Sequence, residues 1–244
     1  MPPPILTAAV ALLFIPLAAL SAQDETNEGE DTSAGLPREY ADYLVASSTL
    51  SPDKKFAVIY PKMEVCTDEP KKGAATRCKD YLVALKPFQI LTTLETKFPQ
   101  FQNKNHGGIS ASWSDDGSAV VVTLDSKWGP EEVFLCEIHD GKVSRSTNLF
   151  QKVHDLFLPD YKAAKMGSAG EFDFIVESPE EGAFGEFVDA DHVRLRAIAT
   201  TDPKETPGRK AWEATVEAVW DVPQARFTSQ KVKRTFAGIR KEED

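Results

Sequence analysis

Residues that most often bind metals are scarce in this sequence, which has three cysteines and four histidines among 244 residues. No two histidines have metal-ligand spacing, and no HExxH or CxxC motif occurs. The acidic residues within 115–116 and 189–191 are explained more simply as turns than as calcium ligands. The sequence therefore predicts no metal site and no cofactor.

Basic residues are also fewer than acidic residues. The chain carries 28 lysines and arginines against 38 aspartates and glutamates, which gives a formal net charge of -10. Nucleic acids and anionic membrane surfaces both require a basic face on the protein that binds them. No run of basic residues interleaved with aromatics is present. We therefore predict that neither is a partner.

A complete catalytic motif is missing as well. His106-Gly107-Gly108 is similar to the oxyanion-hole segment of some esterases, but a G-x-S-x-G nucleophile elbow should then follow. Residues 167–170, Gly-Ser-Ala-Gly, have the wrong spacing for that elbow. A loop before a strand is the simpler interpretation of residues 106–108, and the sequence assigns no catalytic residue.

The N-terminus has one long apolar run. Residues 5–20 read ILTAAVALLFIPLAAL and are followed by the small residues Ser21 and Ala22. A membrane span needs about 20 apolar residues, and Pro16 interrupts this shorter run. The pattern predicts a signal peptide over residues 1–22 and a secreted or periplasmic mature chain without a transmembrane segment. An uncleaved anchor is the alternative, because no lysine or arginine precedes the apolar core.

The rest of the chain divides by composition. Residues 23–36 carry five acids and no base, so they bury too little apolar surface to offset the entropy of ordering. We predict a disordered acidic spacer there. Residues 37–238 suffice for a single domain with one core, and residues 239–244 are interpreted as a charged tail.

Short apolar and β-branched segments separated by turn residues recur along the mature chain, which predicts an all-β fold. One short helix is expected from residue 148, with Asn148 or Thr147 as its cap and Pro159 as its end. The strands are predicted at residues 43–49, 55–60, 80–86, 88–94, 109–113, 118–124, 131–138, 142–147, 171–176, 192–200, 211–220 and 225–234.

Two cysteines and one tryptophan are the candidate site residues. Cys66 and Cys78 flank a polar insertion, and each lies beside a predicted strand, so we predict a disulfide between them. Such a loop would stabilise the fold by roughly 3 kcal/mol in an oxidising compartment. Trp128 lies in a loop between two predicted strands, where an exposed aromatic would contact a partner. Cys136 is expected to be a buried apolar residue.

The order strand, polar turn, apolar strand and long hairpin occurs three times. Residues 50–54 (LSPDK) and 113–117 (WSDDG) resemble the S-P-D-G turns of TolB-like and WD40-like β-propeller repeats, and residues 186–195 form a weaker third copy. The resemblance implies about three blade-like antiparallel units. Because a ring normally takes at least four blades, we predict an open, partly propeller-like or sandwich-like assembly.

Such repeats mostly present surfaces to other molecules, which is an argument from fold alone. The sequence therefore predicts an exported, non-enzymatic module that binds a protein or a cell-envelope component. The residues around Trp128 and the loop between Cys66 and Cys78 are the expected contact elements. The alternatives are a hydrolase-type enzyme whose site is assembled from scattered carboxylates and a structural envelope protein with no discrete ligand.

Overall fold

The computed structural model describes residues 31–67, 78–97, 99–127, 129–165, 172–175, 184–202 and 204–241. The predicted signal peptide, residues 23–30 of the predicted spacer and Trp128 lie outside this part of the chain. Neither helix of the described residues is long and apolar enough to cross a membrane.

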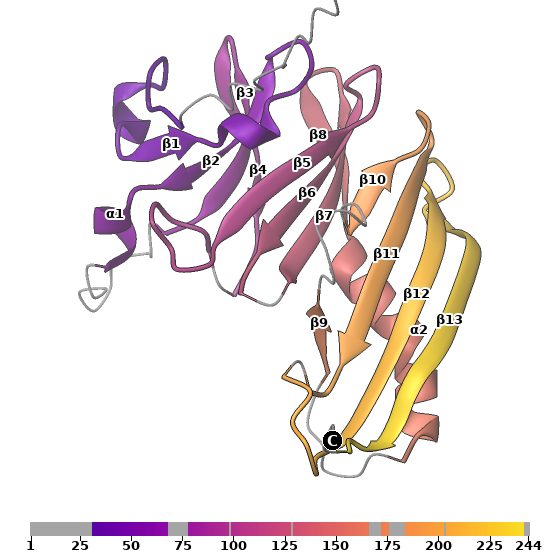
Figure 1. Cartoon of the computed structure of the whole chain (residues 1–244). Coiled ribbons are helices and arrows are strands. Elements are labelled where there is room, and N and C mark those ends of the chain that lie inside the picture. Colours follow the sequence, from indigo (N-terminus) through magenta and orange to yellow (C-terminus); the bar gives the residue numbers. More distant parts are fainter. Residues whose placement is uncertain are drawn as a thin grey trace, which may run out of the picture.

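The described chain consists mainly of three antiparallel sheets (Figure 1). The first contains β1 (Tyr43–Val45), β2 (Phe56–Pro61), β3 (Asp80–Leu85) and β4 (Phe88–Leu94), and the second contains β5 (Gly108–Trp113), β6 (Ala119–Asp125), β7 (Pro130–His139) and β8 (Lys142–Asn148). The third contains β10 (Gly185–Phe187), β11 (His192–Thr200), β12 (Lys210–Asp221) and β13 (Arg226–Ile239), and β9 (Asp173–Ile175) also pairs with β11. Helices are α1 (Met63–Thr67) and α2 (Leu149–Ala163), with 3-10 turns η1 (Arg38–Tyr40) and η2 (Ser47–Thr49).

The predicted mostly β architecture is thereby confirmed. The first two sheets are simple meanders whose neighbouring strands are consecutive in sequence, and so is the third from β10 to β13, whereas β9 pairs with the non-consecutive β11. The sheets form no closed ring within the described residues. Strand β10 and helix α1 were not predicted, because a segment of three or five residues is too short to show a period.

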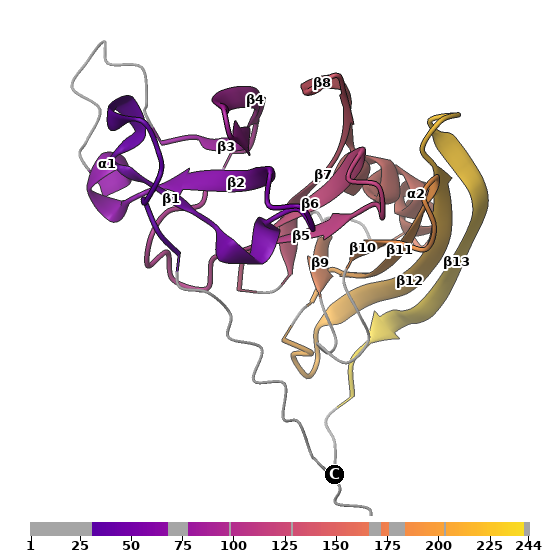
Figure 2. The ribbon, with the colours of Figure 1, turned by 90° about the horizontal axis from the view of Figure 1, so that it is seen from above.

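The second sheet lies between the other two (Figure 2). One side of β6 places Val120, Val122 and Leu124 against the first sheet. The other side places Ala119 and Val121 in a core shared with the third sheet and α2. Residues 119–124 are therefore all buried, which explains why β6 reads as a continuous apolar run rather than an alternating one.

Two turns, one in each of the first two sheets, have the same hydrogen-bond network. Ser51 Oγ donates to Asp53 Oδ1 at 2.8 Å, and Ser114 Oγ donates to Asp116 Oδ1 at 2.8 Å. Each serine hydroxyl also accepts from the amide of the residue five positions later, at 3.0 and 2.9 Å. The repeated sequence thus builds the same turn twice.

The residue after the aspartate has a positive φ in both copies, 56° at Lys54 and 69° at Gly117. Lysine therefore adopts the left-handed conformation that glycine favours. The two turns also hold the sheets together, because Trp113 Nε1 donates to the Thr49 carbonyl at 3.0 Å. The two copies of the repeated turn therefore lie at the contact between the first and second sheets.

Helix α2 begins where the sequence predicts. The Asn148 side chain accepts a hydrogen bond from the Gln151 amide at 2.8 Å, which satisfies one of the free N–H groups at the helix start. Leu149, Val153 and Phe157 are fully buried on one face of the helix. This face covers the apolar side of the third sheet.

The prediction that Pro159 ends the helix is wrong, because α2 continues to Ala163. A proline inside a helix costs about 3 kcal/mol. The turn after it makes compensating tertiary contacts: Asp160 accepts from Trp212 Nε1 at 2.9 Å, and the Tyr161 and Trp212 ring centroids are 5.2 Å apart. Packing against the third sheet therefore outweighs the local preference.

The ordered domain extends past both predicted boundaries. Before residue 37, Thr32 forms a β-bridge with Val45, although it falls in the predicted spacer. After residue 238, Arg240 donates its amide to the Arg209 carbonyl at 2.9 Å, and its guanidinium group lies 3.1 Å from Glu213. These residues looked solvated because their partners are distant in sequence.

Candidate functional site

The predicted disulfide is present between Cys66 and Cys78. It joins α1, which follows β2, to the residues just before β3. Cys136, in contrast, is fully buried in β7, and burial raises the pKa of its thiol to about 11. The third cysteine is therefore a core residue, as the sequence predicts.

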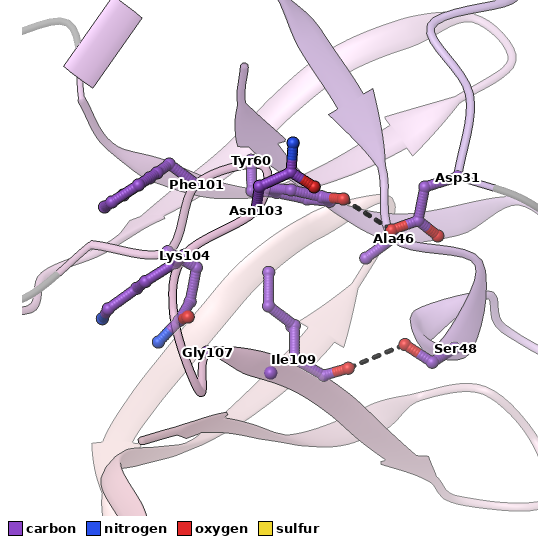
Figure 3. A pocket seen from close by; sticks show the side chains of 11 residues that line it. Asp31, Ala46, Ser48, Tyr60, Phe101, Asn103, Lys104, Gly107 and Ile109 are labelled. Atoms are coloured by element: carbon purple, nitrogen blue, oxygen red, sulfur yellow. Dashed lines mark hydrogen bonds between the residues drawn. The ribbon is translucent and has the colours of Figure 1, made fainter. Parts of the chain in front are cut away.

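A polar pocket of about 210 Å³ lies between the first two sheets, closed on one side by the segment that connects them (Figure 3). It combines two aromatic side chains with hydroxyl, amide, carboxylate and ammonium groups. The lining residues are Asp31, Ala46, Ser48, Tyr60, Gln100, Phe101, Asn103, Lys104, Gly107, Gly108 and Ile109. Asp31 and Ser48 lie on one side of the pocket and Phe101 and Lys104 on the other (Figure 3).

The first wall is held together by Asp31. Its carboxylate accepts from the Tyr60 hydroxyl at 2.6 Å and from the Ser47 amide and hydroxyl, both at 2.8 Å. Burial and the bond to Asp31 raise the pKa of Tyr60, so this hydroxyl remains protonated. Ser48 donates to the Ile109 carbonyl at 2.7 Å, which ties this wall to β5.

The opposite wall is the segment from residue 99 to residue 107. The Gln100 amide donates to Asp80 Oδ2 at 2.8 Å, and the Gln100 side chain donates to the Asp125 carbonyl at 3.0 Å. The Gln102 amide donates to the Pro61 carbonyl at 3.0 Å. These bonds fasten the segment to strands of both sheets, so the pocket wall has a defined position without being part of a sheet.

Gly107 is required by close packing within this segment. A Cβ atom at this position would lie 2.5 Å from Gln100 Oε1 and 2.9 Å from Lys104 Cβ. Any larger residue would displace these two lining side chains. The first glycine of the His-Gly-Gly sequence at 106–108 is thus explained by packing in the pocket wall.

Asp80 lies behind Gln100 and is fully buried. One of its oxygens accepts from the Gln100 amide, and the other, Oδ1, has no hydrogen-bond partner among the described residues. Burial raises the pKa of Asp80 to about 7, although the Gln100 amide and the positive charge of Lys104 act in the opposite direction. This carboxyl supports the pocket wall from behind and has no exposed atom with which to touch a ligand.

A second group of charges consists of Asp125, Glu131 and Lys104. Burial, and then the negative charge of Glu131, raise the pKa of Asp125 to about 6. Lys104 Nζ lies 3.2 Å from Glu131 Oε2. The ammonium group that lines the pocket is therefore already paired with a carboxylate.

The pocket has the groups needed to bind a polar molecule, but its hydroxyls are not arranged for nucleophilic catalysis. A serine nucleophile requires a base within hydrogen-bond distance, whereas Ser48 donates to a backbone carbonyl. Both charged groups of the lining, Asp31 and Lys104, are engaged in internal bonds. The lining can therefore form hydrogen bonds to a ligand that lies beside the rings of Tyr60 and Phe101.

A second pocket, of about 380 Å³, adjoins the disulfide. It lies beside the start of β3 and the end of β4 and is lined by Cys78, Lys79, Thr93, Leu94, Glu95, Thr96, Lys97 and Pro99. The predicted contact loop between the two cysteines is attached at this place, but residues 68–77 lie outside the described chain. Trp128, the other predicted contact residue, lies outside it as well.

Sequence reasoning did not find the first pocket. Its residues come from three separate stretches, 31–60, 100–104 and 107–109, whose proximity depends on how the two sheets pack. The local signal was Gly107, where a Cβ atom would lie too close to Gln100 and Lys104. Within the described residues, no group of three or more histidines, cysteines or acids is placed to hold a metal ion.

Comparison of the sequence with models of known protein families gives no match, and a search of curated proteins finds no related sequence.

Proposed function

We propose that this chain is an exported, non-enzymatic binding module built from blade-like sheets of the TolB-like or WD40-like kind. The shared turn network at Ser51 and Ser114 supports the kinship of the first two sheets. The disulfide between Cys66 and Cys78 supports a secreted or periplasmic location, because disulfides persist in oxidising compartments.

The observation that carries the proposal is the pocket between these two sheets. Its lining pairs the aromatic rings of Tyr60 and Phe101 with a serine hydroxyl and the Asn103 amide, which together provide donors and acceptors. Its charges are internally paired, so a neutral, hydroxyl-rich ligand fits better than an ion. A sugar unit of a cell-envelope glycan has this chemistry, because its C–H face packs on aromatic rings and its hydroxyls hydrogen-bond in both directions.

The alternative, a hydrolase, draws support from the raised pKa values of Asp80 and Asp125 next to the pocket. However, neither residue lines the pocket, and Asp80 is fully buried. A general acid must reach the group that it protonates. The two carboxyls therefore fit a supporting role better than a catalytic one.

The test is calorimetric titration of the mature chain with cellotriose, chitotriose and maltotriose. We expect one of these to bind with a Kd between about 1 µM and 1 mM. Gly107→Ala, which pushes Gln100 and Lys104 out of place, should weaken that affinity at least about tenfold, or about 1.4 kcal/mol. Ser229→Ala, on the exposed part of β13, is the matched control and should leave the affinity unchanged.

Three outcomes would contradict parts of the proposal. Release of reducing sugar during the titration would favour the hydrolase. Binding that is unaffected by Gly107→Ala would remove the pocket as the site, and no heat with any of the three sugars would exclude the glycan class. Export is tested separately: the intact mass of the protein from its host should correspond to a chain beginning at Gln23.

A further inference from the structure

Strand β13 is the longest strand of the described chain and forms the edge of the third sheet (Figure 1). It has 14 residues, whereas the edge strands β4 and β8 of the other two sheets have 7 each. One side of β13 pairs with β12, and no described strand pairs with the other side. The exposed edge therefore presents backbone N–H and C=O groups to the surroundings.

Two irregularities divide this edge. In the register with β12, Thr235 and Thr228 are extra residues of β13, because Glu213 and Ala214 pair with Phe236 and Arg234 while Val219 and Trp220 pair with Ser229 and Phe227. Between them, residues 229–234 pair without interruption. At about 3.4 Å per residue this regular segment is about 20 Å long, which is the length of an ordinary strand.

The charge of β13 is opposite to that of the protein. The strand contains four lysines and arginines and no acid, and Arg240 and Lys241 follow it directly, in a chain of net charge -10. Arg234 and Arg240 are used internally, by Asp160 and by the carboxylates around residue 202. Lys231 and Lys233 are exposed and have no ion-pair partner among the described residues.

The two lysines lie on the same face of the sheet, because side chains alternate along a strand. Their partners in the register are Glu217 and Thr215 of β12, on the face away from the core that contains Val216. A strand added beside residues 229–234 would place every second side chain next to this lysine pair. The intervening side chains would lie near Val232, which packs against the core.

We propose that the free edge of β13 binds an extended acidic segment of a partner protein, which adds to the third sheet as a further strand. The segment has acidic residues at alternate positions, facing Lys231 and Lys233, and apolar residues between them. Backbone hydrogen bonds provide affinity, and the charge pairs select the partner. This surface is separate from the pocket and does not depend on the glycan proposal.

A second copy of the chain fits this edge less well. Pairing of two β13 strands across a twofold axis would place the basic strands side by side, and like charges directly opposite each other are destabilising. Lysines and bulges also protect sheet edges against indiscriminate pairing. Here the same lysines would repel basic strands while attracting acidic ones, which is how specificity is commonly achieved.

The test uses fluorescein-labelled octapeptides and fluorescence anisotropy with the full mature chain. One peptide alternates Glu with Val, the second alternates Lys with Val, and the third alternates Glu with Pro, which keeps the charge but cannot join a sheet. We expect the Glu-Val peptide to bind at least tenfold more tightly than either of the others. Hydrogen exchange should then slow in residues 229–234 and not in β8.

Charge reversal identifies the site. Lys231→Glu/Lys233→Glu should weaken binding of the Glu-Val peptide at least tenfold, whereas the control Lys142→Glu/Lys152→Glu makes the same change in net charge elsewhere and should have no effect. Lys231→Gln/Lys233→Gln serves if the first variant does not fold. Equal binding of the Glu-Pro peptide, or equal binding by the charge-reversed protein, would overturn the proposal. A concentration-dependent dimer that protects residues 229–234 and binds no peptide would assign the edge to a second copy instead.

Discussion

The first two sheets and the third sheet bury their apolar faces in different ways. The first two are short meanders held by a serine-aspartate turn that occurs in both, and they bury their facing sides against each other. The third has longer strands, and its apolar side is covered by α2 as well as by the second sheet. It also carries the paired charges of Arg234 with Asp160 and of Arg240 with Glu213.

The two regions are therefore stabilised by different contacts. In the first two sheets, a polar turn and apolar faces suffice because each sheet has a neighbour of similar shape. The third sheet is the last in the described chain, so a helix takes the place of the next sheet. Its stability should therefore depend on the few large aromatic side chains that join sheet and helix, Trp212 above all.

Trp212→Ala should have the largest effect. Trp212 is fully buried, its Nε1 donates to Asp160, and its ring contacts those of Phe157, Tyr161 and Phe172. We expect a loss of about 3–5 kcal/mol in the free energy of unfolding, measured by urea denaturation. If the loss were below about 1 kcal/mol, the third sheet would not depend on its contact with α2.

The next largest effect is a dependence of the free energy of unfolding on pH, which arises from Asp80 in β3 of the first sheet. Because the pKa of Asp80 is about 7 in the folded protein and about 3.9 in an unfolded chain, the folded state binds more protons between these values. Stability should therefore fall as pH rises from about 4 to about 7, by at most about 4 kcal/mol from this residue. Asp80→Asn should flatten this dependence and be the more stable protein at pH 8.

The measurement is the free energy of unfolding in urea at intervals between pH 4 and pH 8. The exposed Asp115→Asn is the matched control and should retain the pH dependence of the parent protein. A parent protein that gains stability steadily from pH 4 to pH 7, with no difference in the Asp80→Asn variant, would show that Asp80 is ionised and paired in the folded state.

The smallest expected effect tests the likeness of the first two sheets. Ser51→Ala and Ser114→Ala each remove a buried hydroxyl that accepts from a backbone amide. Each should cost about 1–3 kcal/mol, with similar values at both sites. Ser118→Ala removes an exposed hydroxyl of the same turn and should cost less than about 0.5 kcal/mol. Clearly unequal losses at Ser51 and Ser114 would mean that the shared geometry has no shared energetic role.

Much of the strand arrangement could be predicted, because period-two patterns and turn residues are local properties of the chain. The predicted strand at 192–200 agrees with β11 at both ends, and that at 88–94 agrees with β4. The start of α2 was correct for the same reason, since the Asn148 cap acts within three residues. The predicted end of α2 was wrong, because Trp212, which lies 53 residues after Pro159, donates to Asp160 and stabilises the turn that follows the proline.

The candidate site could not be predicted in the same way. The disulfide between Cys66 and Cys78 could be predicted, because these two cysteines flank a single polar insertion and the third cysteine lies far from them in the sequence. The pocket could not be predicted, because Asp31 looked like part of an acidic spacer and Gln100 and Asn103 have no local signature. The hydrogen bond between Asp31 and Tyr60 joins residues 29 positions apart, and neither local sequence indicates that the two side chains meet.

Most strands, the start of α2, the two equivalent turns, the disulfide and the burial of Cys136 could be predicted from the amino-acid sequence, since each depends on neighbours in the chain or on side-chain polarity. Three features follow from the three-dimensional packing alone: Asp80 is buried with no second hydrogen-bond partner among the described residues, Arg240 belongs to the domain, and β13 lies at the edge of its sheet. These features arise from contacts between distant segments. Their free energies depend on distance and burial, which the order of residues does not specify.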